Sequence, residues 1–174
     1  QCEPFRKRYL CVEAVSERLQ ALAQQYELEL LVDESAGAGP MEGLRHGLQV
    51  MPTAYALAVS CDMPLFTFAA AAPLLAAADG TLALVAQADG RRQPLASLYH
   101  RDLMGAFAAA LASGQRKIGA VLAEASHKLV ELAPAEAFFN VNTPADLRLV
   151  RWRLANRHRP VPLITVSAPV SNTG

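Results

Sequence analysis

Short apolar runs and segments of helical periodicity alternate along most of this 174-residue chain. Runs that predict strands lie at residues 28–32, 55–61, 81–86, 95–99 and 127–132. Helical spacing falls between them, at residues 16–26, 41–51, 66–78, 102–112, 118–125 and 145–154, with a break expected near Pro73. Alternating strands and helices predict an α/β fold, a three-layer sandwich with a mostly parallel sheet, in which 81–86 and 95–99 pair antiparallel across a polar turn at 89–94.

The run at residues 55–61 leads directly into Asp62, and Pro64 ends it. It has no polar alternation, so it predicts a central strand buried on both faces, with Asp62 at its carboxyl end. In open α/β sheets ligands bind at the carboxyl ends of the strands. The alternative, that Asp62 only caps a turn or the next helix, has equal weight from this stretch alone.

Two further polar groups follow predicted strands. Asp33 ends the run 28–32, and the glycine-rich stretch 35–40 leads from it into the helix 41–51. A helix N-terminus on a glycine loop favours an anion or the polar edge of a nucleotide, although an ordinary strand–loop–helix turn fits equally well. Residues 138–144 predict a short strand that carries Asn140 and Asn142 into a helix capped by Thr143.

The amino-acid composition excludes some classes of function. The 16 basic residues equal the 16 acidic ones, so a general nucleic-acid surface is not expected. Three cysteines without metal-like spacing indicate reduced thiols and a cytoplasmic protein, and no apolar run is long enough to cross a membrane. One domain over residues 1–155 is expected, incomplete at its N-terminus, followed by a tail or linker at 156–174.

The polar groups at strand ends predict one site. In a doubly wound sheet Asp33, Asp62 and the pair Asn140 and Asn142 converge on one crevice. Oxygen ligands on one or two side chains suit Mg²⁺, which takes its remaining ligands from water and substrate phosphates. The four histidines are scattered and are not expected to act as catalytic bases. The chemistry that fits is magnesium-assisted reaction of a nucleotide.

Four motifs in order resemble the molybdenum cofactor guanylyltransferase family over about residues 28–152. They are Gly39–Leu44, Ser60–Pro64, Arg91–Leu95 and Phe139–Pro144. The resemblance implies a Rossmann-like nucleotidyltransferase that transfers GMP from GTP to molybdopterin and releases pyrophosphate. It also implies that molybdenum insertion proteins or target molybdoenzymes are partners.

The resemblance implies a role for each matched residue. Asp62 would hold Mg²⁺ and, with Asn142, be catalytic. Asp33, Gly39 and Pro40 would line the GTP site together with Asp62. The residues implied for the second substrate, the pterin, are Arg91, Gln93, Asn140 and Asn142.

The match fails at the start of the chain. The family begins with a strand and a glycine-rich loop bearing arginine and lysine, and residues 1–32 have no counterpart. We therefore expect residues 1–174 to bind GTP weakly and to have little activity by themselves. Three alternatives stay open: a molybdopterin cytidylyltransferase, a sugar-phosphate nucleotidyltransferase, and a degenerate, non-catalytic module that binds the cofactor or a partner.

Overall fold

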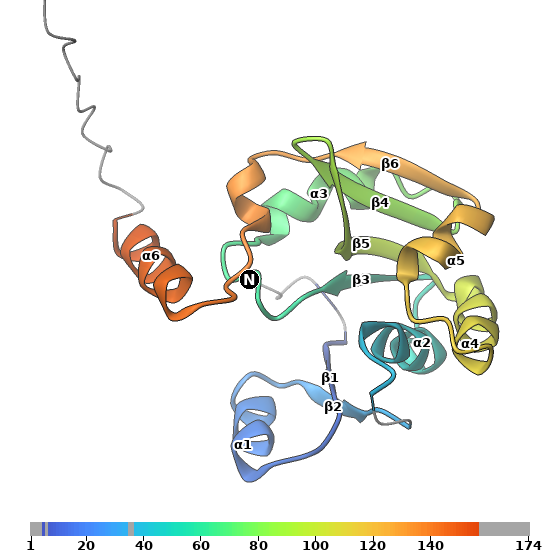
Figure 1. The fold of residues 1–174 in the computed structure, drawn as a ribbon, viewed down its shortest axis with the longest axis horizontal. Coiled ribbons are helices and arrows are strands. Elements are labelled where there is room, and N and C mark those ends of the chain that lie inside the picture. Colours follow the sequence, from blue (N-terminus) through green and yellow to red (C-terminus); the bar gives the residue numbers. More distant parts are fainter. Residues whose placement is uncertain (1–4, 6, 35–36, 157–174) are drawn as a thin grey trace, which may run out of the picture. The chain divides into compact units, whose positions relative to one another are not determined.

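The computed structural model describes residue 5 and residues 7–34 and 37–156 (Figure 1). Its strands are β1 (Tyr9–Val12), β2 (Glu29–Val32), β3 (Tyr55–Val59), β4 (Ala83–Ala88), β5 (Arg91–His100) and β6 (His127–Glu131). Its α-helices are α1 (Glu17–Gln25), α2 (Pro40–Val50), α3 (Phe68–Ala76), α4 (Met104–Ala112), α5 (Ile118–Glu124) and α6 (Pro144–Ala155). Short 3₁₀ turns cover Arg101–Leu103 and Ala135–Phe138. Within this part of the chain no helix has the length and apolarity needed to cross a bilayer.

The chain forms two compact units, Gln1–Asn140 and Val141–Gly174. The first unit holds a four-stranded sheet of order β3-β5-β4-β6 and a two-stranded sheet of β1 and β2. In the larger sheet β3, β4 and β6 run in one direction and β5 runs against its two neighbours. The fold is therefore the α/β class that the alternating pattern predicted. The expected boundary at residue 155 stays a prediction.

Two hydrophobic cores lie on opposite faces of the larger sheet, which makes the three layers. Side chains along β4 alternate between them, because successive strand residues point to opposite faces. Ala83 and Val85 join the core under α2, α4 and α5, whereas Leu84 and Ala86 join the core under α3. Figure 1 shows these helices on the two sides of the sheet.

Strands β4 and β5 form the antiparallel hairpin that the sequence predicted, but the turn is shorter than expected. Asp89 and Gly90 both have positive φ, of 48° and 71°, which is the geometry of a two-residue type I′ turn. The predicted turn at residues 89–94 is therefore wrong beyond Gly90, because Arg91 and its successors already pair with β4.

A bulge interrupts this hairpin and accommodates Pro94. The register jumps from Leu84 opposite Leu98 to Ala86 opposite Gln93, which leaves Pro94 in the irregular part, where its missing N–H costs no ladder bond. The buried Ser97 hydroxyl replaces the lost pairing: it donates to the Gln93 carbonyl at 2.6 Å and accepts from the Ala86 amide at 3.0 Å.

Strand β3 is not the buried central strand that its composition predicted. Among the described strands it pairs with β5 alone, and so it forms an edge of the four-stranded sheet. Its residues are half-buried, and Val59 is 45% exposed. The continuous apolar run of β3 indicated that both of its faces contact other groups. It carries no information on which edge of the strand pairs with a neighbouring strand.

The smaller sheet includes a strand that the sequence did not predict. Strand β1 pairs with β2 in parallel register, Tyr9 opposite Glu29 through Val12 opposite Val32. Arg8 adds an ion pair to Glu27 at 2.8 Å. Helix α2 contacts β1, β2 and β3, and so packs against strands of both sheets. Gly43 permits this approach, because a Cβ there would lie 2.9 Å from the Cys11 Cβ.

Helix α3 is continuous, so the expected break at Pro73 is wrong. The Thr67 hydroxyl caps the helix by accepting from the Ala70 amide. Pro73 removes one interior bond, but its own carbonyl still accepts from the Ala77 amide at 3.0 Å. Burial of Ala71 and Leu74 on either side keeps the helix intact.

The second unit contains α6 with the predicted cap. The Thr143 hydroxyl accepts from the Asp146 amide, and the Asp146 carboxylate accepts from the Thr143 amide, which is a capping box. The predicted strand at 138–144 is wrong: Phe138 ends a 3₁₀ turn and packs on Phe66 instead. Apart from Asn156, which ends α6, the predicted tail lies outside the described residues.

Candidate functional site

Asp62 lies in a tight turn directly after β3. The Ser60 amide donates to the Leu95 carbonyl at 2.7 Å, and the Met63 amide donates back to the Ser60 carbonyl at 3.2 Å. Met63 and Phe66 are buried and anchor the segment in the core. The turn therefore fixes the Asp62 backbone against the bulge of β5.

The Asp62 carboxylate carries an unused acceptor. Its Oδ1 atom is buried and accepts no hydrogen bond from the described residues. Buried oxygens without a partner are rare, so such an atom points to a ligand, ion or water that completes it. A single carboxylate fits Mg²⁺, which commonly takes one or two protein oxygens plus substrate phosphates. In the described part of the chain no three histidine, cysteine or acidic side chains gather into a metal cluster.

Asp33 follows β2 and sits among charged groups. Its amide extends the ladder by donating to the Val12 carbonyl at 2.9 Å. Burial raises the pKa of the Asp33 carboxyl, and the carboxylates of Glu42 and Glu13 raise it further, while His46 and Arg45 lower it. The surroundings therefore disfavour the ionised carboxylate relative to water, and a cationic or hydrogen-bond-donating ligand would offset this effect.

The glycine-rich stretch ends in an open helix N-terminus, as predicted. Gly37 and Gly39 have φ of 72° and 71°, a conformation that favours glycine. Pro40 is the first residue of α2, and no side chain caps the helix. No atom of the described residues lies within 4 Å of where a Gly39 Cβ would stand, so this part of the chain leaves space beside the turn. The amides of the first turn can therefore meet an anion or a nucleotide edge.

Arg91 and Gln93 lie on β5, between the hairpin turn and the bulge. Arg91 stands opposite Ala88 and is exposed, and Gln93 stands opposite Ala86 and is half-buried. The Gln93 carbonyl is held by Ser97, so the bulge fixes the backbone of this substrate-binding candidate. Contact of either side chain with a pterin stays a prediction.

Asn140 and Asn142 fall in different units. Both are exposed, and Asn140 ends the first unit. The Asn142 amide donates to the Asp146 carboxylate at 3.1 Å, so its backbone belongs to the cap of α6. The catalytic and substrate-binding roles implied for the two asparagines stay predictions, as does the convergence of Asp33 and Asp62 on one cleft.

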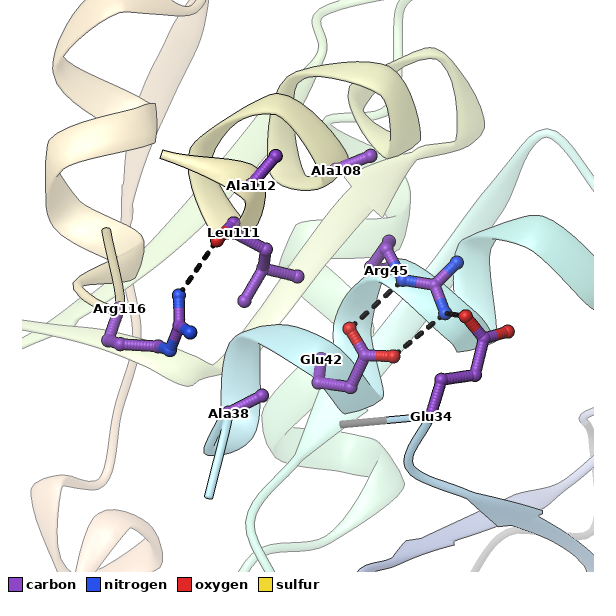
Figure 2. Close-up of a pocket in the computed structure, with 8 residues that line it drawn as sticks. All are labelled: Glu34, Ala38, Glu42, Arg45, Ala108, Leu111, Ala112 and Arg116. Carbon is purple, nitrogen blue, oxygen red and sulfur yellow. Dashed lines mark hydrogen bonds and ion pairs between the residues drawn. The ribbon is translucent and has the colours of Figure 1, made fainter. Parts of the chain in front are cut away.

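The sequence analysis did not predict a cluster of charged side chains that lies near Asp33. Arg45 of α2 binds the Glu42 carboxylate through two nitrogens, at 2.8 and 3.0 Å, and the Glu34 carboxylate at 3.0 Å. Figure 2 shows these pairs on one wall of a pocket of about 330 Å³, with Arg116 on the opposite wall. Glu42 is buried. The one available signal was the three-residue spacing of Glu42 and Arg45 on a predicted helix.

A layered α/β fold with a carboxylate and a glycine-led helix at strand ends is a Rossmann-like architecture. Residues 2–130 match the family model described as MobA-like NTP transferase domain. The chain belongs to this family.

Named relatives agree with this membership. The chain is similar to the molybdenum cofactor guanylyltransferases of Vibrio cholerae, at 33% identity over 63% of this chain and 55% of that protein, and of Bordetella petrii, at 38% over 64% and 60%. The relative from Polynucleobacter asymbioticus is 33% identical over 74% of this chain and 68% of its own length. The chain thus spans little more than half to two thirds of these relatives.

Two solved structures share the fold. The molybdopterin-guanine dinucleotide biosynthesis protein A of Archaeoglobus fulgidus has a TM-score of 0.72 at 22% identity, covering 88% of this chain and 81% of that one. The 2-C-methyl-D-erythritol 4-phosphate cytidylyltransferase of Thermus thermophilus has a TM-score of 0.68 at 19% identity, covering 88% and 84%. At these identities the likeness establishes the fold alone.

Proposed function

We propose that this chain carries the transferase site that moves GMP from GTP to molybdopterin, with Mg²⁺ as cofactor. The observation that carries the proposal is the buried, unpartnered Oδ1 of Asp62 at the end of β3, in a chain of the MobA-like family. The relatives named molybdenum cofactor guanylyltransferase support the choice of substrates. The free thiols of Cys11 and Cys61 support the cytoplasm as its location.

The reaction needs little covalent chemistry from the protein. An oxygen of the molybdopterin phosphate attacks the α-phosphorus of GTP, the bond from that phosphorus to the β-phosphate oxygen breaks, and pyrophosphate leaves with the electron pair. The nucleophile is already anionic at neutral pH, so no general base is required. Rate then depends on in-line placement and on charge neutralisation. Mg²⁺ supplies that neutralisation when bound.

The residues of this chain would position the two substrates. Asp62 would hold the metal beside the phosphates, and the first turn of α2 after Gly39 would offer amides to the nucleotide. Asp33 would accept a hydrogen bond from the base or ribose. On the other substrate, Arg91 would pair with the pterin phosphate, and Gln93 and Asn140 would hydrogen-bond the pterin. A contact of Asn142 with substrate stays a prediction. Molybdenum insertion proteins or molybdoenzymes would take the product.

The test compares Asp62→Asn with a matched change at Asp102, an exposed carboxylate on another surface. GTP affinity is titrated with and without Mg²⁺, and formation of the guanine dinucleotide and pyrophosphate is followed. Asp62→Asn should abolish the magnesium dependence of GTP binding and of guanylyl transfer, whereas Asp102→Asn should behave as the parent chain. A parent chain whose GTP affinity ignores Mg²⁺ would contradict the proposal.

Two competition arms settle the substrates. CTP added at equal concentration should leave guanylyl transfer nearly unchanged, because the relatives are guanylyltransferases. Preferential use of CTP would assign the chain to the cytidylyl alternative. Binding of molybdopterin without any transfer from either nucleotide would favour the non-catalytic module.

A further inference from the structure

Ionisable groups from three segments lie near Asp33. They are Cys11 and Glu13 on or after β1, the adjacent Glu34, and Glu42, Arg45 and His46 on α2. The proposed function gives none of these six a role in binding or transfer. Arg45 differs from the others because its guanidinium binds two carboxylates, those of Glu34 and Glu42 (Figure 2).

Arg45 is held more firmly than a surface ion pair. Its side chain is 11% exposed, and Glu42 on the inner side is 5% exposed. Two nitrogens of the guanidinium bind the two oxygens of Glu42, and a third binds the Gln49 side chain at 2.6 Å. Planar, two-point contacts of this kind fix orientation as well as position.

Glu34 is anchored twice by this arrangement. Its carboxylate pairs with Arg45 at 3.0 Å, and its backbone amide faces the Glu42 carboxylate closely enough to lower the pKa of Glu42. Asp33 is the preceding residue, and its own amide is fixed by Val12 on the other side. The peptide that carries Asp33 is thus tied to β1 at one end and to α2 at the other.

From this geometry we propose that Arg45 is a positioning residue, which through Glu34 and Glu42 holds the Asp33 carboxylate in place for the nucleotide. The inference rests on the proposed function, since it takes Asp33 as a nucleotide contact. The positive charge of Arg45 also favours the ionised form of Asp33. It lowers the pKa of the Asp33 carboxyl, whereas burial, Glu42 and Glu13 raise it.

The chain offers a matched control. Arg116 lies on the opposite wall of the same pocket, and its guanidinium donates to the Leu111 and Gln115 carbonyls rather than to Glu34 or Glu42. Arg45→Gln and Arg116→Gln therefore remove the same group from the same cavity. Arg45→Lys keeps the charge and loses the two-point contact. The double variant Glu42→Gln/Arg45→Gln removes both members of the buried ion pair and so leaves no buried carboxylate unpaired. It provides a folded protein for the same measurements if Arg45→Gln alone unfolds.

Three readouts are taken on residues 1–174. Amide hydrogen exchange at Glu34 reports the anchor, and the pH titration of the Asp33 carboxyl by NMR reports the charge; neither needs a nucleotide. Calorimetric titration with GTP and Mg²⁺ reports binding. Arg45→Gln should speed Glu34 exchange, raise the Asp33 pKa and weaken GTP binding about 10-fold to 100-fold.

The double variant separates position from charge. It should also speed Glu34 exchange and weaken GTP binding, but it should lower the Asp33 pKa, because Glu42 acts on Asp33 more strongly than Arg45 does. Arg45→Lys should lie between the parent and Arg45→Gln, and Arg116→Gln should match the parent. A folded Arg45→Gln or double variant with parent-like Glu34 exchange and GTP affinity overturns the inference. If neither the parent nor any variant binds GTP, as the unmatched N-terminal loop leads us to expect, the proposed function is judged by the magnesium-dependent transfer test above, and Glu34 exchange alone decides the anchor.

Discussion

The two acidic strand ends of the first unit are built in opposite ways. Asp62 is held by its backbone, and its Oδ1 is buried without a partner. Asp33 stands at the edge of a cluster in which Glu34, Glu42 and Arg45 already satisfy one another. One end keeps a strong acceptor free, whereas the other surrounds its carboxylate with fixed charges.

The difference shows what each end can do. A buried oxygen without a donor lowers stability until a ligand completes it, so Asp62 suits a group that binds and leaves. A network with every member paired resists movement, so the cluster near Asp33 suits a fixed reference for a substrate. Variants at the first end should therefore change turnover, and variants at the second should change stability and affinity.

The largest effect is expected for Asp62→Ala. Magnesium-dependent guanylyl transfer should fall about 100-fold to 1,000-fold, comparable to the loss of one essential electrostatic group. Thermal unfolding without Mg²⁺ should occur at the same temperature or higher, because the variant removes an unsatisfied oxygen. Transfer retained within a few-fold would show that the metal is held elsewhere.

Glu42→Ala tests the charged cluster near Asp33. Arg45 loses its two-point partner inside a site that is only 11% exposed, so the free energy of unfolding should fall by about 3 kcal/mol. Urea denaturation followed by circular dichroism measures it. A decrease below about 0.5 kcal/mol would place this pair among ordinary surface ion pairs.

Ser97→Ala probes the bulge that supports Asp62. The change leaves the Ala86 amide and the Gln93 carbonyl without their partner in the core, which should cost about 2 kcal/mol. Because Leu95 of the bulge accepts from Ser60, transfer should weaken as well. Ser97→Thr keeps the hydroxyl and serves as the control. A bulge stabilised by backbone alone would give equal stability in both variants.

Gly39→Ala should have a smaller effect, about 1 kcal/mol. The φ of 71° is strained for alanine, and the space around it is empty, so the loss is conformational rather than steric. Gly47→Ala, within α2 and also without near neighbours, should instead stabilise by about the helix propensity difference. Differential scanning calorimetry compares the two variants, and the opposite order would contradict the assigned conformation.

The smallest effect on the unfolding temperature is expected for Asp33→Asn, and this effect should depend on pH. The folded-state pKa of Asp33 is raised, so its ionisation opposes folding above that pKa, and the penalty disappears as pH falls below the ordinary value of 3.8. Asp33→Asn should therefore raise the unfolding temperature at pH 7 and leave it unchanged near pH 3. Asp146→Asn should do the reverse at pH 7, because hydrogen bonds from Thr143 lower the pKa of Asp146. Equal responses of the two variants would contradict these directions.

Much of the fold could be predicted because local rules agreed with the final packing. The alternation of strands and helices, the Thr143 cap and the antiparallel hairpin all follow from short-range spacing and turn chemistry. Asp33 and Asp62 were found because each follows an apolar run, and Gly39 was found because it lies in a glycine-rich stretch before a predicted helix. Strand β1 was missed because its four residues, flanked by charged residues, have no period long enough to detect.

The sequence alone determined the class of fold, the position of each acid after its strand and the family resemblance, because these depend on neighbours a few residues apart. Only the tertiary structure decided that β3 is an edge, that Pro94 lies in a bulge held by Ser97, and that Arg45 joins Glu42 to Glu34. Pairing of strand edges and of charges depends on which distant segments meet, and hydrophobic periodicity does not encode that choice.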